Sequence, residues 1–160
     1  MMHEYRVTKY DPQYRVNGAY ARNEWTSISD VGKEFDGCIF TMDEYERVER
    51  HYADFVCELT EKCGVFPLSI DAYSEIHHND TWREGQLIRR EELYAIVQGN
   101  LREECWCRLN GTGFFIHFGY DYYIYVGCEL PLEAIQTLAE KYGLFCEPFR
   151  SPYHDEEDAE

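Results

Sequence analysis

The sequence predicts an α+β fold: a single, mostly antiparallel β-sheet with about three helices packed on one face. The stretch from Glu104 to Val126 contains three β-rich runs separated by two turn signals, which is the pattern of an antiparallel meander. Helical patterns precede and follow this meander in the order αβαβββαβ. Helices placed outside a hairpin-linked sheet are typical of α+β domains.

The best-defined helix is expected from Met42 to Cys63. Thr41 and Glu44 have the spacing of a capping box, in which the Thr41 hydroxyl accepts a hydrogen bond from the Glu44 amide. Apolar residues then recur at helical spacing. Gly64 suits the end of this helix, because glycine adopts the left-handed conformation without steric cost.

Two shorter helices are expected over residues 89–101 and 131–142, each with an apolar stripe on one side. Pro131 suits the first position of the later helix, where its missing N–H removes no hydrogen bond. Residues 144–149 are expected to form a closing strand.

The strand predictions before the meander are less sharply defined. Residues 1–9 alternate only loosely and indicate at most an edge strand. Residues 65–73 alternate well, but Pro67 cannot donate to a ladder, so this strand lies at an edge or begins there. The polar segment 74–85 is expected to be an exposed loop.

Within the meander, Asn110-Gly111 is the strongest hairpin signal, because a type I′ turn needs positive φ at both central residues. Alternation predicts which side chains of the following strands face the core, beneath the helix over 42–63. These are Phe114, Ile116, Phe118, Tyr122, Ile124 and Val126.

The length of 160 residues suits one domain, expected over residues 1–153. Ser151 to Tyr153 are expected to leave the fold. Residues 154–160 contain five acids and are predicted to be a disordered acidic tail.

The formal net charge of −16 argues against binding to nucleic acid or to anionic membranes, since both are polyanions. It favours a basic partner instead. No apolar run approaches the ~18 residues of a membrane span. The first residues lack the apolar region of a signal peptide, so a cytoplasmic location is expected.

The seven cysteines do not have the pattern of a disulfide framework, because their number is odd and only Cys105 and Cys107 lie close together in the sequence. A zinc site would need a second pair, which the sequence lacks. We therefore expect no disulfide, no metal and no cofactor, with the cysteines acting as small buried hydrophobes.

No residue pattern identifies a catalytic site. The sequence contains no nucleophile elbow and no glycine-rich phosphate loop followed by a helix. His117 is the best candidate for a general base, because it lies on an aromatic strand near tyrosines. A satisfied histidine within an aromatic face is the more frequent case.

Fourteen tyrosines are a high number, and several of them cluster with aspartate in the stretch 120–125. Tyrosine is favoured at protein interfaces because it combines an apolar ring with a polar tip. The same residues would also serve to cover a small sheet, and the sequence leaves these two roles equally open.

Two stretches resemble a known class of proteins. They run from Lys9-Tyr-Asp-Pro to Glu24-Trp-Thr-Ser-Ile-Ser-Asp-Val-Gly32, and from Tyr142-Gly-Leu to Glu147-Pro-Phe-Arg-Ser-Pro-Tyr153. They are similar to small, acidic, cytoplasmic bacterial immunity proteins that are encoded beside polymorphic or contact-dependent secreted toxins. The resemblance implies a protein that neutralises one cognate toxin by contact and has no chemistry of its own.

The expected function is therefore binding to a basic protein, such as a toxin domain, through an acidic, tyrosine-rich surface. The residues expected at this surface are Tyr120, Asp121, Tyr123, Tyr125, His78 and Asp80. The alternative is a small-ligand-binding protein or enzyme with a pocket around His117, lined also by Trp106, Tyr123 and Tyr125. A third possibility is a structural or adaptor module.

Overall fold

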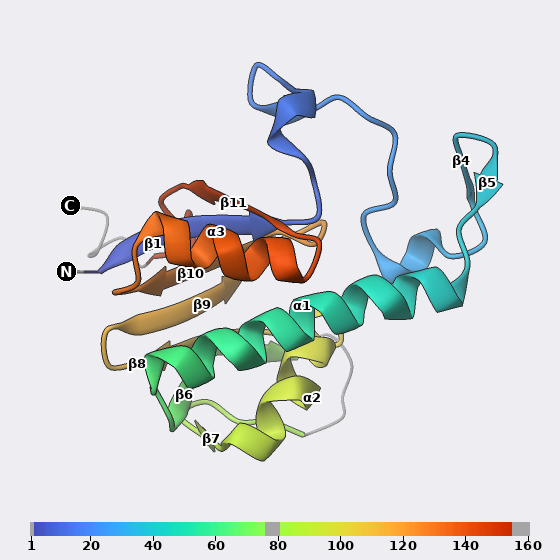
Figure 1. The fold of residues 1–160 in the computed structure, drawn as a ribbon. Helices are drawn as coiled ribbons and strands as arrows, with labels where there is room; N and C mark the ends of the chain where they lie inside the picture. Colours follow the sequence, from blue (N-terminus) through green and yellow to red (C-terminus); the bar gives the residue numbers. More distant parts are fainter. Residues whose placement is uncertain (1, 76–80, 155–160) are drawn as a thin grey trace.

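The computed structural model describes residues 2–75 and 81–154, and its core is one seven-stranded sheet (Figure 1). In the order β11-β1-β10-β9-β8-β6-β7, every pair of neighbouring strands is antiparallel. In chain order these strands are β1 (His3–Thr8), β6 (Leu68–Glu75), β7 (Leu87–Ile88), β8 (Cys105–Gly111), β9 (Phe114–Phe118), β10 (Ile124–Cys128) and β11 (Phe145–Pro148).

Three helices cover one face of this sheet, which confirms the predicted α+β fold (Figure 1). They are α1 (Met42–Cys63), α2 (Arg90–Leu101) and α3 (Leu132–Lys141). The Thr41 hydroxyl accepts a hydrogen bond from the Glu44 amide at 3.2 Å, and Gly64 ends α1 with φ 62°. Both ends of α1 therefore lie where its capping residues predict them.

The core lies between the helices and the sheet. All six side chains predicted to face it are at most 3% exposed, so the predicted face is confirmed. Tyr52, Phe55 and Leu59 of α1 pack into the same cluster and are fully buried. Alternation on β9 and β10 thus places the side chains correctly beneath α1.

The position of β1 differs from the prediction of a weak edge strand. It lies inside the sheet, where Tyr5 pairs with Val126 of β10 on one side and with Pro148 of β11 on the other. Tyr5 and Val7 are buried. Pairing with strands more than a hundred residues away leaves no local signal, which is why loose alternation understated this strand.

The second face of the sheet is also covered, although Ser151 to Tyr153 were expected to leave the fold. Residues 149–154, which we call the C-terminal strap, lie across Phe115, His117 and Tyr125. These three side chains are at most 6% exposed. The strap is held by hydrogen bonds and ring contacts between individual side chains, which sequence periodicity does not reveal.

His154, the first residue of the predicted tail, also contacts the sheet. The Nε2 atom of His154 lies 2.6 Å from the carboxylate of Glu4, and its ring contacts Phe115 and His117. His154 is therefore the last described residue of the strap. The remaining tail, residues 155–160, lies outside the described residues.

The hairpin between β8 and β9 does not turn at Asn110-Gly111. Gly111 still pairs with Phe114, and the chain turns at the next two residues, with φ 64° at Gly113. A Cβ atom on Gly111 would lie 2.9 Å from the Leu68 side chain. Glycine is thus needed at this position for close packing against β6, and the turn prediction was wrong by two residues.

Residues 9–41 form a long excursion between β1 and α1, which we call the β1–α1 loop (Figure 1). Trp25 anchors it in the core with its ring stacked on Phe40 at 4.4 Å. The loop contains two small hairpins and two short 3₁₀ helices: η1 (Pro12–Tyr14), β2 (Arg15–Val16), β3 (Ala19–Tyr20), η2 (Ile28–Asp30), β4 (Glu34–Phe35) and β5 (Cys38–Ile39).

Candidate functional site

The connection between β9 and β10 is a tight turn with unusual backbone angles. The Tyr123 amide donates to the Tyr120 carbonyl at 3.2 Å, and the two central residues, Asp121 and Tyr122, have φ of 59° and 67°. Such angles suit a type I′ turn, which asparagine and glycine normally supply. A bulky tyrosine in this region is strained, and strain of this kind persists only where the surroundings hold it in place.

Tyr122 is held by a buried aromatic cluster. Its ring meets Trp25 at 5.1 Å, Tyr45 at 5.8 Å and Tyr52 at 5.0 Å, each edge to face. Its side chain is 3% exposed. The packing energy of these rings offsets the backbone strain, because edge-to-face pairs add to the free energy of burial.

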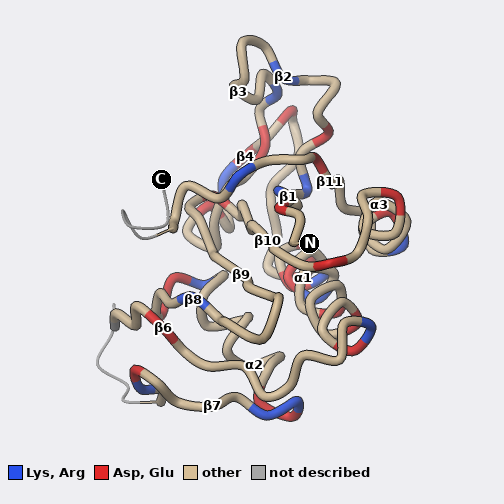
Figure 2. The backbone as a smooth tube through the Cα atoms, turned by 90° about the vertical axis from the view of Figure 1, so that its left-hand side faces the viewer, with Lys and Arg blue, Asp and Glu red and all other residues tan. Residues whose placement is uncertain are grey.

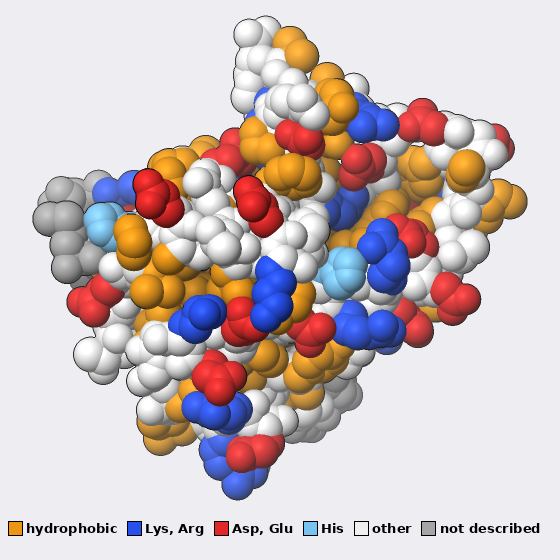
Figure 3. All heavy atoms as spheres, viewed as in Figure 1, with side chains coloured by type: hydrophobic (Ala, Val, Ile, Leu, Met, Phe, Trp, Pro, Cys, Tyr) orange, Lys and Arg blue, Asp and Glu red, His pale blue; other side chains and the backbone are white. Residues whose placement is uncertain are grey.

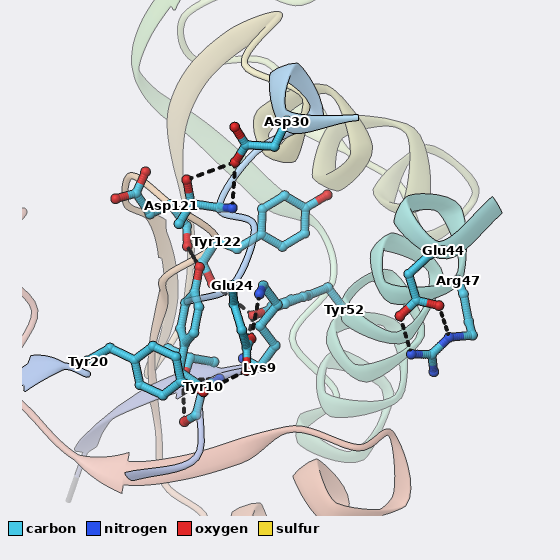
Figure 4. A network of polar contacts seen from close by, with 12 residues as sticks. Lys9, Tyr10, Tyr20, Glu24, Asp30, Glu44, Arg47, Tyr52, Asp121 and Tyr122 are labelled. Carbon is cyan, nitrogen blue, oxygen red and sulfur yellow. Dashed lines mark hydrogen bonds and ion pairs between the residues drawn. The ribbon is translucent and has the colours of Figure 1, made fainter. Parts of the chain in front are cut away.

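A single hydroxyl ties the same turn to α1. The Tyr52 hydroxyl donates to the Tyr122 carbonyl at 2.9 Å and accepts from the Lys9 amide at 2.6 Å. Figure 4 shows Tyr52 reaching from the helix toward the turn, with Tyr10 and Lys9 beside it. The turn is therefore positioned from the core of the protein.

Because Tyr122 points inward, its neighbours point outward. Tyr120 is 78% exposed, the most exposed of the large hydrophobic side chains in the described part of the chain. Asp121 is also exposed, and Tyr123 is half-buried. The turn thus presents an aromatic ring and a carboxylate on a backbone with little freedom to move.

A hollow of about 490 Å³ opens beside this turn. The β1–α1 loop forms one side of it, and the turn, β10 and the C-terminal strap form the other. We call it the tyrosine hollow, after the residues that dominate its lining: Tyr10, Tyr20, Tyr120, Tyr123, Tyr125 and Tyr153.

An ion pair joins Glu24, which lines the tyrosine hollow, to the largely buried Lys9. The Lys9 ammonium lies 2.9 Å from the Glu24 carboxylate, and Tyr20 donates its hydroxyl proton to the other oxygen of Glu24 at 2.6 Å. Burial lowers the pKa of Lys9, and the bond to Glu24 opposes this shift. Burial, followed by the bond to Glu24, raises the pKa of Tyr20, so its hydroxyl stays protonated at neutral pH.

A second hollow, of about 580 Å³, also has Tyr120 in its lining. Trp106, Cys105, Ile28 and Ser74 also line it. Tyr120 therefore projects from a ridge that both hollows share. A partner would therefore meet one protruding ring, that of Tyr120, with a hollow on each side of it.

The structure brings four of the six predicted contact residues together. Tyr120, Asp121, Tyr123 and Tyr125 all line the tyrosine hollow. Tyr125 is only 6% exposed, so it supports the wall more than it offers free surface. The other two predicted residues, His78 and Asp80, lie outside the described residues.

Sequence reasoning missed the half of the site that comes from the β1–α1 loop. Tyr10, Tyr20 and Glu24 are about a hundred residues from the turn, yet the Tyr10 hydroxyl donates to the Asp121 carbonyl at 2.6 Å. The one available signal was the density of tyrosine and arginine in this turn-rich segment. Nothing in that density indicates where in space the segment packs.

The pocket expected around His117 is divided among three separate hollows. Trp106 lines the second hollow, Tyr123 and Tyr125 line the tyrosine hollow, and His117 lines a third one, of about 500 Å³, beside Glu4. His117 and Tyr125 are directly paired on β9 and β10, but the C-terminal strap lies over both of them. Tyr153 of the strap also contacts Trp106, and alternation alone does not show this cover.

His117 itself is locked in place beneath the strap. Its Nδ1 atom lies 2.6 Å from the Ser151 hydroxyl, and its ring stacks on Phe115 at 4.2 Å. Burial, followed by the neighbouring charges of His154 and Arg108, lowers its pKa to about 4. The imidazole is thus neutral at pH 7, where its hydrogen bond with Ser151 helps to fasten the strap.

Over residues 2–75 and 81–154, no group of three or more His, Cys, Asp or Glu side chains is arranged to hold a metal ion. The seven cysteines are free thiols. No helix in the described ranges has the length and apolar character needed to cross a membrane.

Comparisons of the chain with protein-family models, with curated proteins and with solved structures found no match. The geometry of the tyrosine hollow and of its ridge is therefore the basis for the function proposed below.

Proposed function

We propose that this chain binds a basic protein partner reversibly, through the ridge that carries Tyr120 and the two hollows beside it. The observation that carries the proposal is the 78% exposure of Tyr120 on a turn that the buried Tyr122 holds fixed. Exposed aromatic anchors on rigid backbone are typical of binding hot spots, because little conformational entropy is lost on association.

The charge of the chain supports a basic partner. Figure 2 shows acidic residues spread along many elements of the backbone, with basic ones among them. Figure 3 shows no single continuous acidic patch on the face that it draws. The net charge of −16 therefore acts through the overall field of the molecule. Such a field speeds encounters with a positively charged partner and slows them with nucleic acid.

The resemblance to immunity proteins suggests which partner to test first. In this proposal the partner is a toxin domain encoded beside the chain, neutralised by contact in the cytoplasm. Toxins that attack nucleic acid are basic, so the sign of the charge is complementary. The proposal includes no chemical step on the partner.

The test is to co-express the chain with the product of the neighbouring gene and to co-purify the two. The association rate of the purified proteins is then measured across a salt series. We expect a complex with a dissociation constant below micromolar and an association rate that falls as salt rises, because screening at 0.15 M acts over roughly 8 Å. No complex at micromolar concentration would contradict the proposal.

The alternative, an enzyme or small-ligand-binding protein with its site at His117, is tested by measuring substrate turnover. If the third hollow acted on a small substrate, His117→Ala would abolish turnover while leaving the exposure of Tyr120 unchanged. Such a result, together with the lack of a protein partner, would replace the binding proposal with an enzyme.

A further inference from the structure

The tyrosine hollow is walled by aromatic rings that come from separate parts of the chain. The Tyr10 ring lies 4.8 Å from that of Tyr20 and 5.3 Å from that of Tyr123, and Tyr125 lies 5.7 Å from Tyr153. Aromatic faces carry partial negative charge and attract cations that approach them. A hollow with such walls is suited to a cationic group.

Cationic side chains of the protein itself already lie against two of these rings. The Lys9 ammonium lies 4.3 Å from the centre of the Tyr10 ring, and the guanidinium of Arg15 lies 5.4 Å from that of Tyr123. Lys9 is paired with Glu24 at 2.9 Å, and Arg15 lies 3.7 Å from Glu147. The Arg6 guanidinium also lies 5.5 Å from the centre of the Tyr123 ring and shares Glu147 with Arg15. Rings of the hollow thus already hold cationic groups at cation–π distance.

Two hydroxyl groups at the hollow, those of Tyr10 and Tyr20, favour a ligand that donates hydrogen bonds. Tyr10 gives its proton to the Asp121 carbonyl, and Tyr20 gives its proton to Glu24, each at 2.6 Å. With these protons in use, both oxygens have only acceptor capacity left. Burial raises the pKa of both hydroxyls, so they do not become competing anions.

Two carboxylates and one base also line the hollow: Glu24, the exposed Asp121 and Arg22. The guanidinium of Arg22 lies 4.6 Å over the ring of Tyr14. Tyr14 is not part of the lining, so Arg22 has a ring of its own outside the hollow. Glu24 is already paired with Lys9, so the exposed Asp121 is the carboxylate of the lining that can meet a positive charge from outside.

We propose that the tyrosine hollow binds the guanidinium group of an arginine side chain presented by the partner. Guanidinium is planar, stacks on aromatic rings and carries five donors with no acceptor, which matches rings, carboxylates and acceptor hydroxyls. This inference rests on the proposed function, and it specifies the chemistry by which the partner is recognised.

The test uses a small probe in place of the partner. Nα-acetyl-arginine amide is titrated into the full chain, and the ring signals of the tyrosines are followed by NMR. Nα-acetyl-citrulline amide, which has nearly the same shape without the charge, is the matched control. We expect saturable shifts at Tyr20, Tyr120 and Tyr123 with the arginine probe, and at least tenfold weaker binding of the citrulline probe.

Two variants show whether the hollow itself is the site. Tyr20→Leu removes one wall, Asp121→Asn removes one charge while keeping the turn, and each should weaken arginine binding at least threefold. Tyr94→Leu, on the exposed side of α2, should leave it unchanged. Equal binding of both probes, or arginine binding that neither site variant weakens, overturns the inference.

The outcomes separate this inference from the proposed function. If the partner binds but the arginine probe causes no saturable shift, the guanidinium site is wrong and the binding function stands. If the arginine probe binds as expected but no partner forms a complex at micromolar concentration, the site stands and the proposed function fails. If Tyr20→Leu does not fold, Asp121→Asn still decides the inference.

Discussion

The hydroxyl of Tyr52 in the middle of α1 donates a hydrogen bond to the carbonyl of Tyr122 in the β9–β10 turn, at 2.9 Å. The same hydroxyl accepts from the Lys9 amide at 2.6 Å, just after the end of β1. One fully buried oxygen therefore joins the helix layer, the sheet and the start of the β1–α1 loop. The two halves of the tyrosine hollow are aligned through this contact.

Tyr52→Phe removes this hydroxyl and leaves the ring in place. The Lys9 amide and the Tyr122 carbonyl then lose a buried partner, which costs about 1–3 kcal/mol of unfolding free energy. Urea denaturation measures the loss. Tyr94→Phe, on a half-exposed ring of α2, is the matched control and should change stability by less than about 0.5 kcal/mol. Equal stability of the two variants would show that the Tyr52 hydroxyl does not hold the turn.

Asp121 is predicted to serve binding at the expense of stability. Asp121→Gly removes a side chain at φ 59°, so the unfolding free energy should rise by roughly 0.5–1 kcal/mol. Asp121→Asn keeps a residue that tolerates this conformation and removes only the charge. Both variants should bind the partner more slowly, while only the glycine variant gains stability. A glycine variant that is less stable than the wild type would show that the turn is unstrained.

His117 should make the protein sensitive to acid. Its pKa is lowered to about 4 in the folded chain, chiefly by burial, against about 6.5 in the unfolded chain. The unfolded state therefore takes up a proton first as the pH falls. This contribution to stability is intact above pH 6.5 and declines by about 2–3 kcal/mol as the pH falls to 4.

His117→Asn isolates that contribution, because asparagine can still hydrogen-bond Ser151 and does not titrate. Unfolding free energies of wild type and variant are measured from pH 7 to pH 4. Carboxylates titrate alike in both proteins, so only the difference between the curves matters. This difference should shrink toward pH 4, whereas parallel curves would contradict the lowered pKa.

The C-terminal strap is predicted to be part of the stable fold. A chain that ends at residue 150 loses the strap contacts of Phe115, His117 and Tyr125 and should lose at least about 2 kcal/mol through exposed apolar area. A chain that ends at residue 154 keeps these contacts and is the control. Thermal unfolding compares the two, and identical stability would show that the strap is dispensable.

Sequence patterns predicted the elements whose signals are local. The predictions failed where contacts between residues far apart in the chain determine the structure. Thr41 and Gly64 delimit α1 by their own chemistry, so its ends were predictable. Asn110-Gly111 has the chemistry of a turn, yet Leu68 of β6 requires Gly111 inside a strand. The separate turn between β9 and β10 has left-handed residues at Asp121 and Tyr122, where the buried ring of Tyr122 outweighs the local preference.

In the candidate site, too, the residues of one local stretch were predicted and those from distant parts of the chain were missed. The tyrosines and Asp121 of the stretch 120–125 were identified from composition. Tyr122 is buried as predicted, although it lies in the turn before β10 and not in the expected strand. Tyr10, Tyr20 and Tyr153 complete the hollow from both ends of the chain. Their contacts depend on β1 entering the middle of the sheet and on the strap folding back, and neither event has a periodic signal.

The dissociation rate of the Tyr120→Ala variant from the toxin domain tests the proposed binding surface most directly. Tyr120 is 78% exposed, so its truncation should not disturb the fold of the free chain. As a hot spot it should raise the dissociation rate about 30-fold or more, which corresponds to a loss of about 2 kcal/mol or more. Tyr94→Ala, another exposed tyrosine, should leave the rate unchanged. Equal dissociation rates for Tyr120→Ala and wild type would contradict the proposed surface.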